Sequence, residues 1–345
     1  MHGAPTRKPS NVIANTTGAA EAPMPTGIEP ELPSLVVAAP PGDDWVHEIK
    51  FDGYRILASI ERGQVTLHTR KGNNWTARIP FLAEALRSIP VKTAVLDGEL
   101  VALDERGMSD FQRLQDALGG APERQAGLVY YAFDLLYLDG VDLRAVGLAQ
   151  RKSLLATLLA GVPSPFARTI RLSDHVIGQG PAFFAQAARM GLEGIVSKQR
   201  NAPYRAGRSR AWLKMKCTHR QEFVVVGFTD PKGTRSLLGA LLLATQTGNA
   251  LVYRGRVGTG FSENSLRDLH HKLAPLRDKP PALVHPPVGP EARGVHWVKP
   301  ELVAEVSFSR LTQDGLLRHS IFLGLREDKA ASEVILEGPV GTGSD

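Results

Sequence analysis

The chain has 345 residues, of which 43% are hydrophobic and 22% are charged, and its formal net charge is +6. These values are ordinary for a globular protein, and the length indicates about two domains. No stretch approaches the roughly 20 apolar residues of a membrane-spanning helix, and the N-terminus lacks the apolar core of a secretory signal, so we expect neither. Cys217 is the only cysteine. It excludes an intrachain disulfide and a zinc site made of several cysteines, and it is typical of a reducing cytosol.

The first part of the chain predicts a tail followed by mixed strands and helices. Residues 1–27 are rich in Ala, Pro, Thr and Asn and have few large apolar side chains, which predicts a disordered tail. Beyond residue 28, alternation and helical spacing of apolar residues define the elements. We expect strands at 45–50, 55–61, 64–69, 94–103, 129–138, 194–199 and 211–216, and helices at 81–89, 110–118, 148–159 and 180–190.

The pattern changes after Arg220, where short apolar segments are separated by Gly, Asp and Pro. We expect strands at 222–230, 238–245, 250–258 and 304–311, and one helix at 263–273. Several short strands with one helix in about 115 residues favour a small closed barrel such as an OB-fold. We place the domain boundary near residues 217–221.

Lys50 lies where a predicted strand meets a turn, in the segment EIKFDGYR at residues 48–55. The turn would hold the amine at a rigid edge. A lysine becomes a nucleophile when burial and nearby cations lower its pKa, and Arg55 could provide such a charge. A lysine before a turn is also a common surface residue, so this segment alone leaves both interpretations open.

Two carboxylates share one face of the predicted strand at 94–103. Alternation puts Asp97 and Glu99 on the same side, among valines. Such carboxylates are unfavourable unless they are ion-paired, hydrogen-bonded or metal-bound, although a solvent-facing edge would also explain them. Glu193 lies at the entry to another apolar strand. The acidic residues therefore leave a metal site and a solvated edge as alternatives.

Basic and aromatic residues suggest nucleotide or phosphate binding, and each of them also has a structural explanation. Alternation puts Lys214 and Lys216 on one strand face, which suits a phosphate but also protects an exposed sheet edge. Phe133 is predicted to face away from Asp134, either in the core or as a stacking platform. The run 198–220 has eight Lys or Arg and no Asp or Glu, which is typical of a solvated face or of a phosphate-binding surface.

Seven segments resemble, in order, the motifs of the covalent nucleotidyltransferases, the family of DNA ligases, RNA ligases and mRNA capping enzymes. Lys50–Arg55 resembles the nucleotide-accepting KxDGxR motif. The other segments are Thr69–Gly72, Asp97–Glu99, Tyr131–Asp134, Glu193–Lys198, Trp212–Lys216 and Arg326–Lys329. Within the family, residues 228–244 and 315–329 are similar to the ligase domain of the bacterial end-joining ligase D, although Ser320 stands where we expect Pro. The resemblance covers roughly residues 28–330.

The resemblance implies an α+β fold with two domains. An adenylation (nucleotidyltransferase) domain with antiparallel sheets and flanking helices would span residues 28–218, an OB-fold β-barrel residues 219–335, and a tail residues 336–345. It also implies an ATP-dependent DNA ligase that acts in repair or end joining with Mg²⁺ or Mn²⁺. Such an enzyme seals nicks between a 3′-hydroxyl and a 5′-phosphate through lysyl-AMP and AMP-DNA intermediates.

The resemblance also implies roles for individual residues. Lys50 is the implied nucleophile, and Asp52, Arg55, Lys214 and Lys216 complete the implied catalytic set. The implied ATP-binding residues are Glu48, Lys50, Arg55, Arg70, Glu99, Phe133, Lys214, Lys216, Arg326 and Lys329. Phe133 would stack on adenine, Arg326 and Lys329 would orient the pyrophosphate with Asp328, and Glu99 and Glu193 would bind the metal. Arg205, Arg208 and Arg210 lie in a Gly- and Ser-containing loop, and we expect them to be exposed and to contact DNA phosphates, as Arg70 would.

Two alternatives remain at this point. An RNA ligase or a capping enzyme could use the same scaffold, and a non-catalytic nick- or end-binding module could keep the fold without the chemistry. The joint presence of Lys50, Glu193, Lys214 and Lys216 argues against an idle site. We expect a monomer in the bacterial cytosol that binds nicked double-stranded DNA, and recruitment by a Ku-type end-binding protein stays open.

Overall fold

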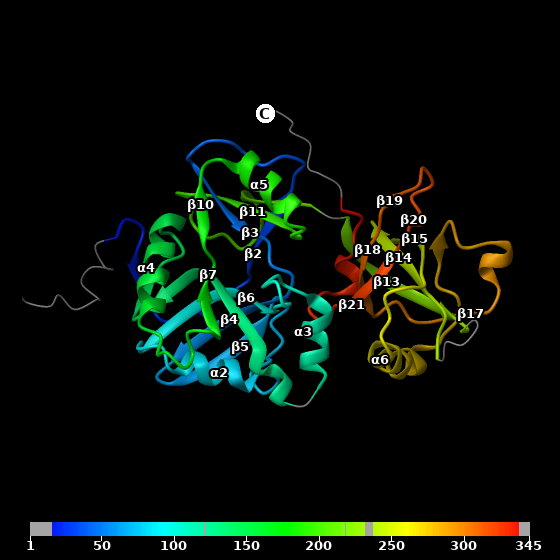
Figure 1. Ribbon diagram of the computed structural model, residues 1–345, viewed down its shortest axis with the longest axis horizontal. Coiled ribbons are helices and arrows are strands. Elements are labelled where there is room, and N and C mark those ends of the chain that lie inside the picture. Colours follow the sequence, from blue (N-terminus) through cyan, green and yellow to red (C-terminus); the bar gives the residue numbers. More distant parts are fainter. Residues whose placement is uncertain (1–15, 121, 218, 232–236, 338–345) are drawn as a thin grey trace, which may run out of the picture. The chain divides into compact units, whose positions relative to one another are not determined.

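The computed structural model describes residues 16–120, 122–217, 219–231 and 237–337. Its contacts divide the chain into two compact units, the first ending at Cys217 and the second following it (Figure 1). In the described part of the chain, no helix is both long enough and apolar enough to cross a membrane.

The larger sheet of the first unit has the strand order β1-β8-β7-β6-β4-β5, with β9 paired to β7. Its strands are β1 (Ala20–Glu21), β4 (Tyr54–Glu61), β5 (Gln64–Thr69), β6 (Thr93–Ala102), β7 (Leu128–Leu138), β8 (Val141–Asp142) and β9 (Ile170–Leu172). Three helices pack against it, namely α2 (Pro80–Arg87), α3 (Phe111–Leu118) and α4 (Leu148–Ala160). Because alternate side chains of a strand share a face, one side of this sheet and the helices enclose the main core.

A bulge on β7 changes where two predicted residues point. The β6–β7 register shifts between Asp97 and Gly98, so that Phe133 is an extra residue on β7. Arg55 lies over the Phe133 ring and also binds Asp97, the cross-strand partner of Asp134. Phe133 and Asp134 therefore share one side of the sheet. The prediction that they face opposite ways is wrong because it assumed unbroken alternation.

The second sheet of the first unit has the order β10-β3-β11-β12-β2. Its strands are β2 (Glu31–Leu35), β3 (Trp45–Ile49), β10 (His175–Ile177), β11 (Gly194–Gln199) and β12 (Gly207–Lys216), and helix α5 (Gly180–Arg189) packs on it. The β12–β2 and β7–β9 pairs are parallel. The expectation of antiparallel sheets is therefore corrected to mixed sheets.

The segment before residue 28 is partly ordered into the first unit. β1 pairs with β8, the Tyr137 hydroxyl donates to the carbonyl oxygen of Ala22 at 2.8 Å, and Met24 packs against buried apolar residues. The predicted disordered tail is therefore wrong for residues 16–27, where a two-residue strand is too short to leave a pattern. Residues 1–15, and residues 338–345 of the predicted C-terminal tail, lie outside the described residues.

Local capping explains where the helices begin. The Asp110 side chain accepts from the N–H of Arg113 at 3.1 Å and caps α3. The first N–H groups of α4 donate to carbonyl oxygens in the loop after β11, from Leu148 to Ala202 at 3.1 Å and from Ala149 to Arg200 at 2.8 Å. These bonds fix the start of α4 beside the second sheet.

The second unit contains a seven-stranded sheet of order β16-β15-β14-β13-β18-β21, with β17 paired to β13, and a separate β19–β20 hairpin. The strands are β13 (Arg220–Thr229), β14 (Leu241–Thr247), β15 (Ala250–Val257), β16 (Leu283–Val284), β17 (Val295–Trp297), β18 (Val303–Ser307), β19 (Arg310–Leu311), β20 (Leu317–Arg318) and β21 (Ile321–Leu325). Helix α6 (Glu263–Leu273) has the predicted bounds and starts at a capping box formed by Ser262 and Ser265. The 3₁₀ helices of the chain are η1 (Pro122–Gly127), η2 (Ala274–Leu276), η3 (Gly289–Ala292) and η4 (Ala331–Glu333).

Candidate active site

Lys50 lies directly after β3, at the end of the second sheet where β11 begins and β12 ends. Its backbone N–H donates to the carbonyl oxygen of Gly194 at 3.0 Å, and Gly194 is the cross-strand partner of Lys216. The Lys50 ammonium donates to the Glu193 carboxylate. The Lys50 side chain is 23% exposed and that of Glu193 only 5%. A partly accessible amine is thus fixed by a buried acid.

Lys214 and Lys216 lie on the same face of the second sheet as Glu48. The Cα register aligns Lys214 with Val196 and Val196 with Glu48, and directly paired residues point to the same face. Both lysines are half-buried, whereas Met215 between them is fully buried in the core beneath α5. This arrangement agrees with the predicted alternation and brings two ammonium groups to the sheet that carries Lys50.

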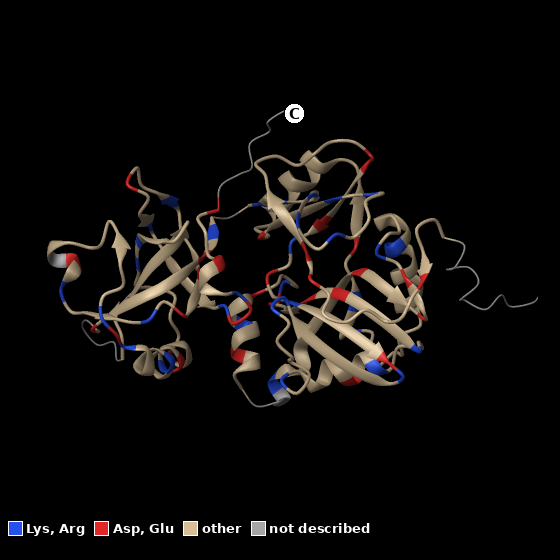
Figure 2. Cartoon of the chain, turned by 180° about the vertical axis from the view of Figure 1, so that it is seen from behind, with Lys and Arg blue, Asp and Glu red and all other residues tan. Residues whose placement is uncertain are grey.

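Glu48 is enclosed and accepts three hydrogen bonds. Lys152 of α4 and Lys198 of β11 donate to Oε1 at 2.8 and 3.0 Å, and the Ser173 hydroxyl donates to Oε2 at 2.8 Å. Burial disfavours the charged carboxylate, but the two ammonium groups outweigh burial and hold the pKa of Glu48 below its ordinary value. Along the chain as a whole, acidic and basic residues are interspersed in both units (Figure 2).

The Phe133 ring is half-buried and packs against a cation and an indole. The Lys198 ammonium lies 4.3 Å from the centroid of Phe133 and 4.2 Å from that of Trp212. Phe133 and Trp212 meet edge to face with centroids 5.9 Å apart. These contacts are attractive because the ring faces carry negative charge density. Phe133 is therefore rigidly held, as a stacking platform requires.

Arg55 is buried, and its guanidinium binds the protein itself. Nε and Nη2 donate to the two oxygens of Asp97 at 2.9 and 2.5 Å, and Nη1 donates to the carbonyl oxygen of Glu31 at 2.6 Å. The Tyr204 hydroxyl also donates to Asp97, at 2.8 Å. Although burial disfavours the cation, Asp97 raises the pKa of Arg55. Of the alternatives for Asp97, the structure therefore favours the ion-paired one.

Three further predicted residues lie around the first sheet. Asp52 is buried in the turn between β3 and β4, and its backbone N–H donates to the Ser109 hydroxyl at 3.0 Å. Glu99 is half-buried on β6, opposite Arg55 on β4. Arg70 is half-buried after β5 and lines a cavity of about 1310 Å³ beside residues 23–30. The predicted site therefore draws on both sheets of the first unit.

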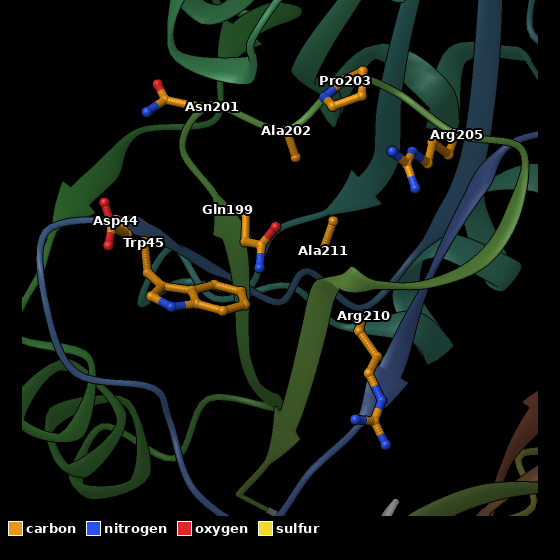
Figure 3. A pocket seen from close by; sticks show the side chains of 9 residues that line it. All are labelled: Asp44, Trp45, Gln199, Asn201, Ala202, Pro203, Arg205, Arg210 and Ala211. Atoms are coloured by element: carbon orange, nitrogen blue, oxygen red, sulfur yellow. The ribbon is translucent and has the colours of Figure 1, made fainter. Parts of the chain in front are cut away.

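Arg205, Arg208 and Arg210 are all exposed, as predicted. The prediction that they share a loop is wrong for two of them, because β12 already begins at Gly207. Arg205 and Arg210 line a pocket at the end of β11 (Figure 3). Arg208 instead donates to the carbonyl oxygen of Pro33 at 2.5 Å. Arg205 and Arg210 are therefore the stronger candidates for phosphate contacts.

Arg326 and Lys329 bind carboxylates within the second unit, and Asp328 is one of these carboxylates. Arg326 donates through Nε and Nη2 to Asp328 at 2.8 Å each, and through Nη1 to Glu305 at 2.9 Å. The Lys329 ammonium lies 3.2 Å from the Glu222 carboxylate. The final predicted motif thus belongs to a compact cluster of ion pairs.

Two family models match these two units. The ATP dependent DNA ligase domain matches residues 33–216, which is more than half of the chain, and the ATP dependent DNA ligase C terminal region matches residues 234–329. The chain belongs to the ATP-dependent DNA ligase family. The family resemblance predicted from the motifs is confirmed.

The ligase is also similar to bacterial end-joining proteins. It is 43% identical over 322 residues to the multifunctional non-homologous end joining protein LigD of Pseudomonas aeruginosa, over 92% of this chain and 38% of that protein. The LigD of Mycobacterium tuberculosis is 38% identical over 303 residues, which are 87% of this chain and 38% of that protein. The solved structure of mycobacterial DNA ligase D complexed with ATP and MES matches with a TM-score of 0.66 and 36% identity, over 89% of this chain and 97% of that one. The ligase thus spans less than half the length of these LigD proteins.

The acids predicted to bind a metal ion in the ligase are not gathered into one cluster. Within the described residues, no group of three or more His, Cys, Asp or Glu side chains could hold a metal ion. The two predicted ligands are separated in the fold, with Glu99 on β6 and Glu193 just before β11. Mg²⁺ keeps several waters and is usually bound by one or two carboxylates plus substrate phosphates. A metal ion at either glutamate would therefore need substrate phosphates as further ligands.

Sequence reasoning missed four buried residues of the ligase site: Glu31, Arg151, Lys152 and Tyr204. Arg151 makes a bidentate pair with Asp134 at 2.7 and 2.8 Å. A signal for the α4 pair was present, since Arg151 and Lys152 lie between Leu148 and Leu155 at the i+3 and i+4 positions of the buried helix stripe. Charges at such positions require buried partners. Glu31 and Tyr204 carry no comparable signal.

Proposed function

We propose that this ligase uses ATP to seal DNA nicks between a 3′-hydroxyl and a 5′-phosphate through a lysyl-AMP intermediate. The observation that carries the proposal is the partly exposed Lys50 amine, fixed beside Glu193 at the strand end that also holds Lys216. The mycobacterial relative was solved with ATP, and the LigD proteins are named for end joining, which supports this chemistry in DNA repair or end joining. Because the chain spans 38% of those proteins, the proposal extends only to ligation.

In the first step, the Lys50 amine attacks the α-phosphate of ATP, forms a phosphorus–nitrogen bond and displaces pyrophosphate. The hydrogen bond to Glu193 holds the protonated amine in position, and Nζ must release a proton before it can attack. Lys214 and Lys216 are the cations expected at the AMP phosphate. Arg326 and Lys329 are those expected at the pyrophosphate. Fixed cations stabilise the charge that gathers on a phosphoryl group in transfer.

The nucleotide base would be held by Phe133, which stacks on adenine beside Glu48. The rigid packing of Phe133 against Lys198 and Trp212 supports this role. Mg²⁺ or Mn²⁺ would be bound by Glu99 and Glu193 together with the phosphates, and would neutralise phosphate charge.

Arg55 and Asp52 would act by positioning. The resemblance implied that Arg55 binds ATP, but its bidentate pair with Asp97 favours a role in fixing the strand that follows Lys50. Asp52 is buried in the turn that connects Lys50 to this strand. Both residues would therefore set the direction of the Lys50 amine.

In the later steps, AMP passes to the DNA 5′-phosphate and the 3′-hydroxyl then displaces AMP. We propose that Arg70, Arg205 and Arg210 contact the DNA backbone, with Arg208 supporting them. Phosphate contacts carry little sequence information, so nick binding should tolerate any sequence.

The domain assignment and the cellular setting complete the proposal. Residues 28–218 would form the adenylation domain and residues 219–335 an OB-fold barrel, followed by a tail at 336–345. The C-terminal family match supports the OB-fold. We propose a monomer in the bacterial cytosol, recruited to DNA ends by a Ku-type protein.

Lys50→Ala tests the proposal. The variant should take up no AMP from ATP labelled at the α-phosphate, yet should still seal a nick whose 5′ end is already adenylated, because that step needs no lysyl-AMP. Lys92→Ala, which changes an exposed lysine, is the control and should label normally.

Three outcomes would count against the proposal. Label that persists on Lys50→Ala would show that another residue is the nucleophile. Faster sealing of nicked RNA than of nicked DNA would favour an RNA ligase. A wild-type chain that takes no label would favour a non-catalytic nick-binding module.

A further inference from the structure

Two glutamates stand directly opposite each other in the second unit. Glu222 on β13 and Glu305 on β18 are cross-strand Cα partners in an antiparallel pair. Like charges at such positions destabilise a sheet unless cations compensate them. Glu305 is buried, so water screens its charge poorly. The pair therefore requires cations of the protein nearby.

The compensating cations are residues of the final ligase motif. Glu305 accepts from Arg326 Nη1 at 2.9 Å, and Glu222 lies 3.2 Å from the Lys329 ammonium. Asp328 binds the other edge of the Arg326 guanidinium with two bonds. Arg220 also lies near Glu305, with its Nη2 at 3.6 Å from Oε1. These ion pairs thus connect Glu222, Glu305 and Asp328 to Arg220, Arg326 and Lys329.

The cluster fixes the direction of both motif cations. Each nitrogen of the Arg326 guanidinium donates to a carboxylate oxygen, so its side-chain torsions cannot rotate without breaking a charge-assisted bond. Lys329 has four flexible carbon–carbon bonds, and its ammonium is directed toward Glu222, 3.2 Å away. Preorganised cations stabilise a transition state because they need not reorient during the reaction.

We infer that Glu222 and Glu305 are positioning residues for the first step, holding Lys329 and Arg326 ready for the pyrophosphate of ATP. The inference rests on the proposed function, in which those two cations orient the leaving group. Neither glutamate touches the nucleotide in this role. Both act through the cation that they bind.

The test uses Glu305→Gln and Glu222→Gln in the full chain, because glutamine keeps the size of the side chain and removes the charge. The rate of AMP attachment at saturating ATP should fall about tenfold or more in each variant, the usual effect of losing a hydrogen bond between charged groups. Sealing of an already adenylated nick should stay at the wild-type rate, because no pyrophosphate leaves in that step. A purely structural role would slow both reactions together.

Glu327→Gln is the matched control. Glu327 lies between the motif cations in sequence but pairs with Lys272 at 2.9 Å, so this variant should attach AMP at the wild-type rate. Attachment rates within about twofold of wild type in both cluster variants would overturn the inference. Equal losses in both reactions, with a lowered melting temperature, would overturn it too. A wild-type chain that takes no AMP would instead overturn the proposed function, and this inference with it.

Discussion

Glu48 is the buried anion that binds two ammonium groups, both through its Oε1 atom. Because Lys152 and Lys198 are buried away from water, their ammonium groups would repel each other strongly. The Glu48 carboxylate that both of them bind offsets this repulsion. The rings of Phe133 and Trp212 beside Lys198 add a weaker attraction. The proposed adenine platform and this charge cluster are therefore one packing unit.

Removing the charge of Glu48 should destabilise the first unit. Breaking one partner of a buried ion pair typically costs 3–5 kcal/mol, so we expect Glu48→Gln to lower the free energy of unfolding by about 3 kcal/mol in chemical denaturation. Glu61→Gln, which changes an exposed glutamate, should shift it by less than about 0.5 kcal/mol. Equal stability of the two variants would contradict the charge-balance argument.

Glu48 should also make the folding stability of the protein depend on pH. Folding holds the pKa of Glu48 below its ordinary value of 4.5, because its ammonium partners outweigh burial. Ionised Glu48 therefore stabilises the fold fully above pH 4.5, and this contribution is lost as the pH falls through the lower folded pKa. Wild type should lose stability in that acid range more steeply than Glu48→Gln, and parallel pH curves would contradict the prediction.

At the scale of elements, the pairing of β11 with β12 depends on Gly194, which has no side chain. A Cβ on Gly194 would fall against the carbonyl oxygen of Met215 and within 3.0 Å of the Lys216 Cα. These are backbone atoms of β12, so they cannot rotate away. A larger residue at Gly194 must push β11 and β12 apart at the end that carries Lys50.

Gly194→Ala should therefore impair AMP attachment. We expect a loss of about a hundredfold, the scale of an ångström-sized misplacement of reacting groups, when labelled AMP uptake is measured. Gly127→Ala is the control, because nothing lies within 4 Å of a Cβ built there. Equal rates in the two variants would show that the strand end tolerates the shift.

Regular elements were predictable where one pattern ran unbroken. The helix at 263–273 has the predicted bounds, because an amphipathic stripe follows a Ser cap. β12 was predicted at 211–216 but begins at Gly207, because an irregularity between Ser209 and Leu213 interrupts its pairing with β2. β7 was predicted as a strand, but its bulge at Phe133 depends on the register with β6. Register is a property of two strands, which one strand's sequence does not contain.

Within the candidate site, the residues that lie in sequence motifs were predictable, but their ion-pair partners were not. The lysines on β12 share a face, as alternation predicted. The partners of the buried charges come from distant segments, 104 residues apart for Lys152 and Glu48 and 42 for Arg55 and Asp97. Nothing in the local pattern of either segment specifies such a pairing, so Arg55 was expected at the substrate.

At the scale of the whole molecule, the two units should divide the chemistry. A chain ending at Cys217 keeps Lys50 and the cores of the first unit but lacks Arg326 and Lys329. We expect it to take up little labelled AMP from ATP. We also expect it to remain folded, with a cooperative transition in thermal melts. Near-normal attachment would remove the case for the second unit in the first step.

The salt dependence of DNA affinity should show whether the exposed arginines of the first unit contact DNA phosphates. Each phosphate contact contributes about −0.9 to the slope of log affinity against log salt, so replacing Arg205, Arg208 and Arg210 by Ala should flatten the slope by up to about three units. Most of the change should come from Arg205 and Arg210, because Arg208 binds the backbone of the protein. AMP attachment should stay largely intact.

The control for this measurement replaces three other exposed arginines of the first unit, Arg106, Arg124 and Arg168, by Ala. It lowers the net charge equally but should leave the slope nearly unchanged. An unchanged slope in the first triple variant would contradict phosphate contact. Loss of AMP attachment there would place those arginines at the nucleotide instead.

Helix α4 joins the two sheets of the first unit through adjacent residues. Arg151 binds Asp134 on β7 of one sheet, and Lys152 binds Glu48 on β3 of the other, with both basic side chains buried. Neither sheet can separate from the helix without exposing an unpaired charge inside the protein. Opening of the two sheets should therefore be cooperative, and amide protons of β3 and β7 should exchange with solvent at similar free energies. The proposed nucleotide site would then be lost in a single event, with no partly open form that keeps only Phe133 or only Lys214 and Lys216.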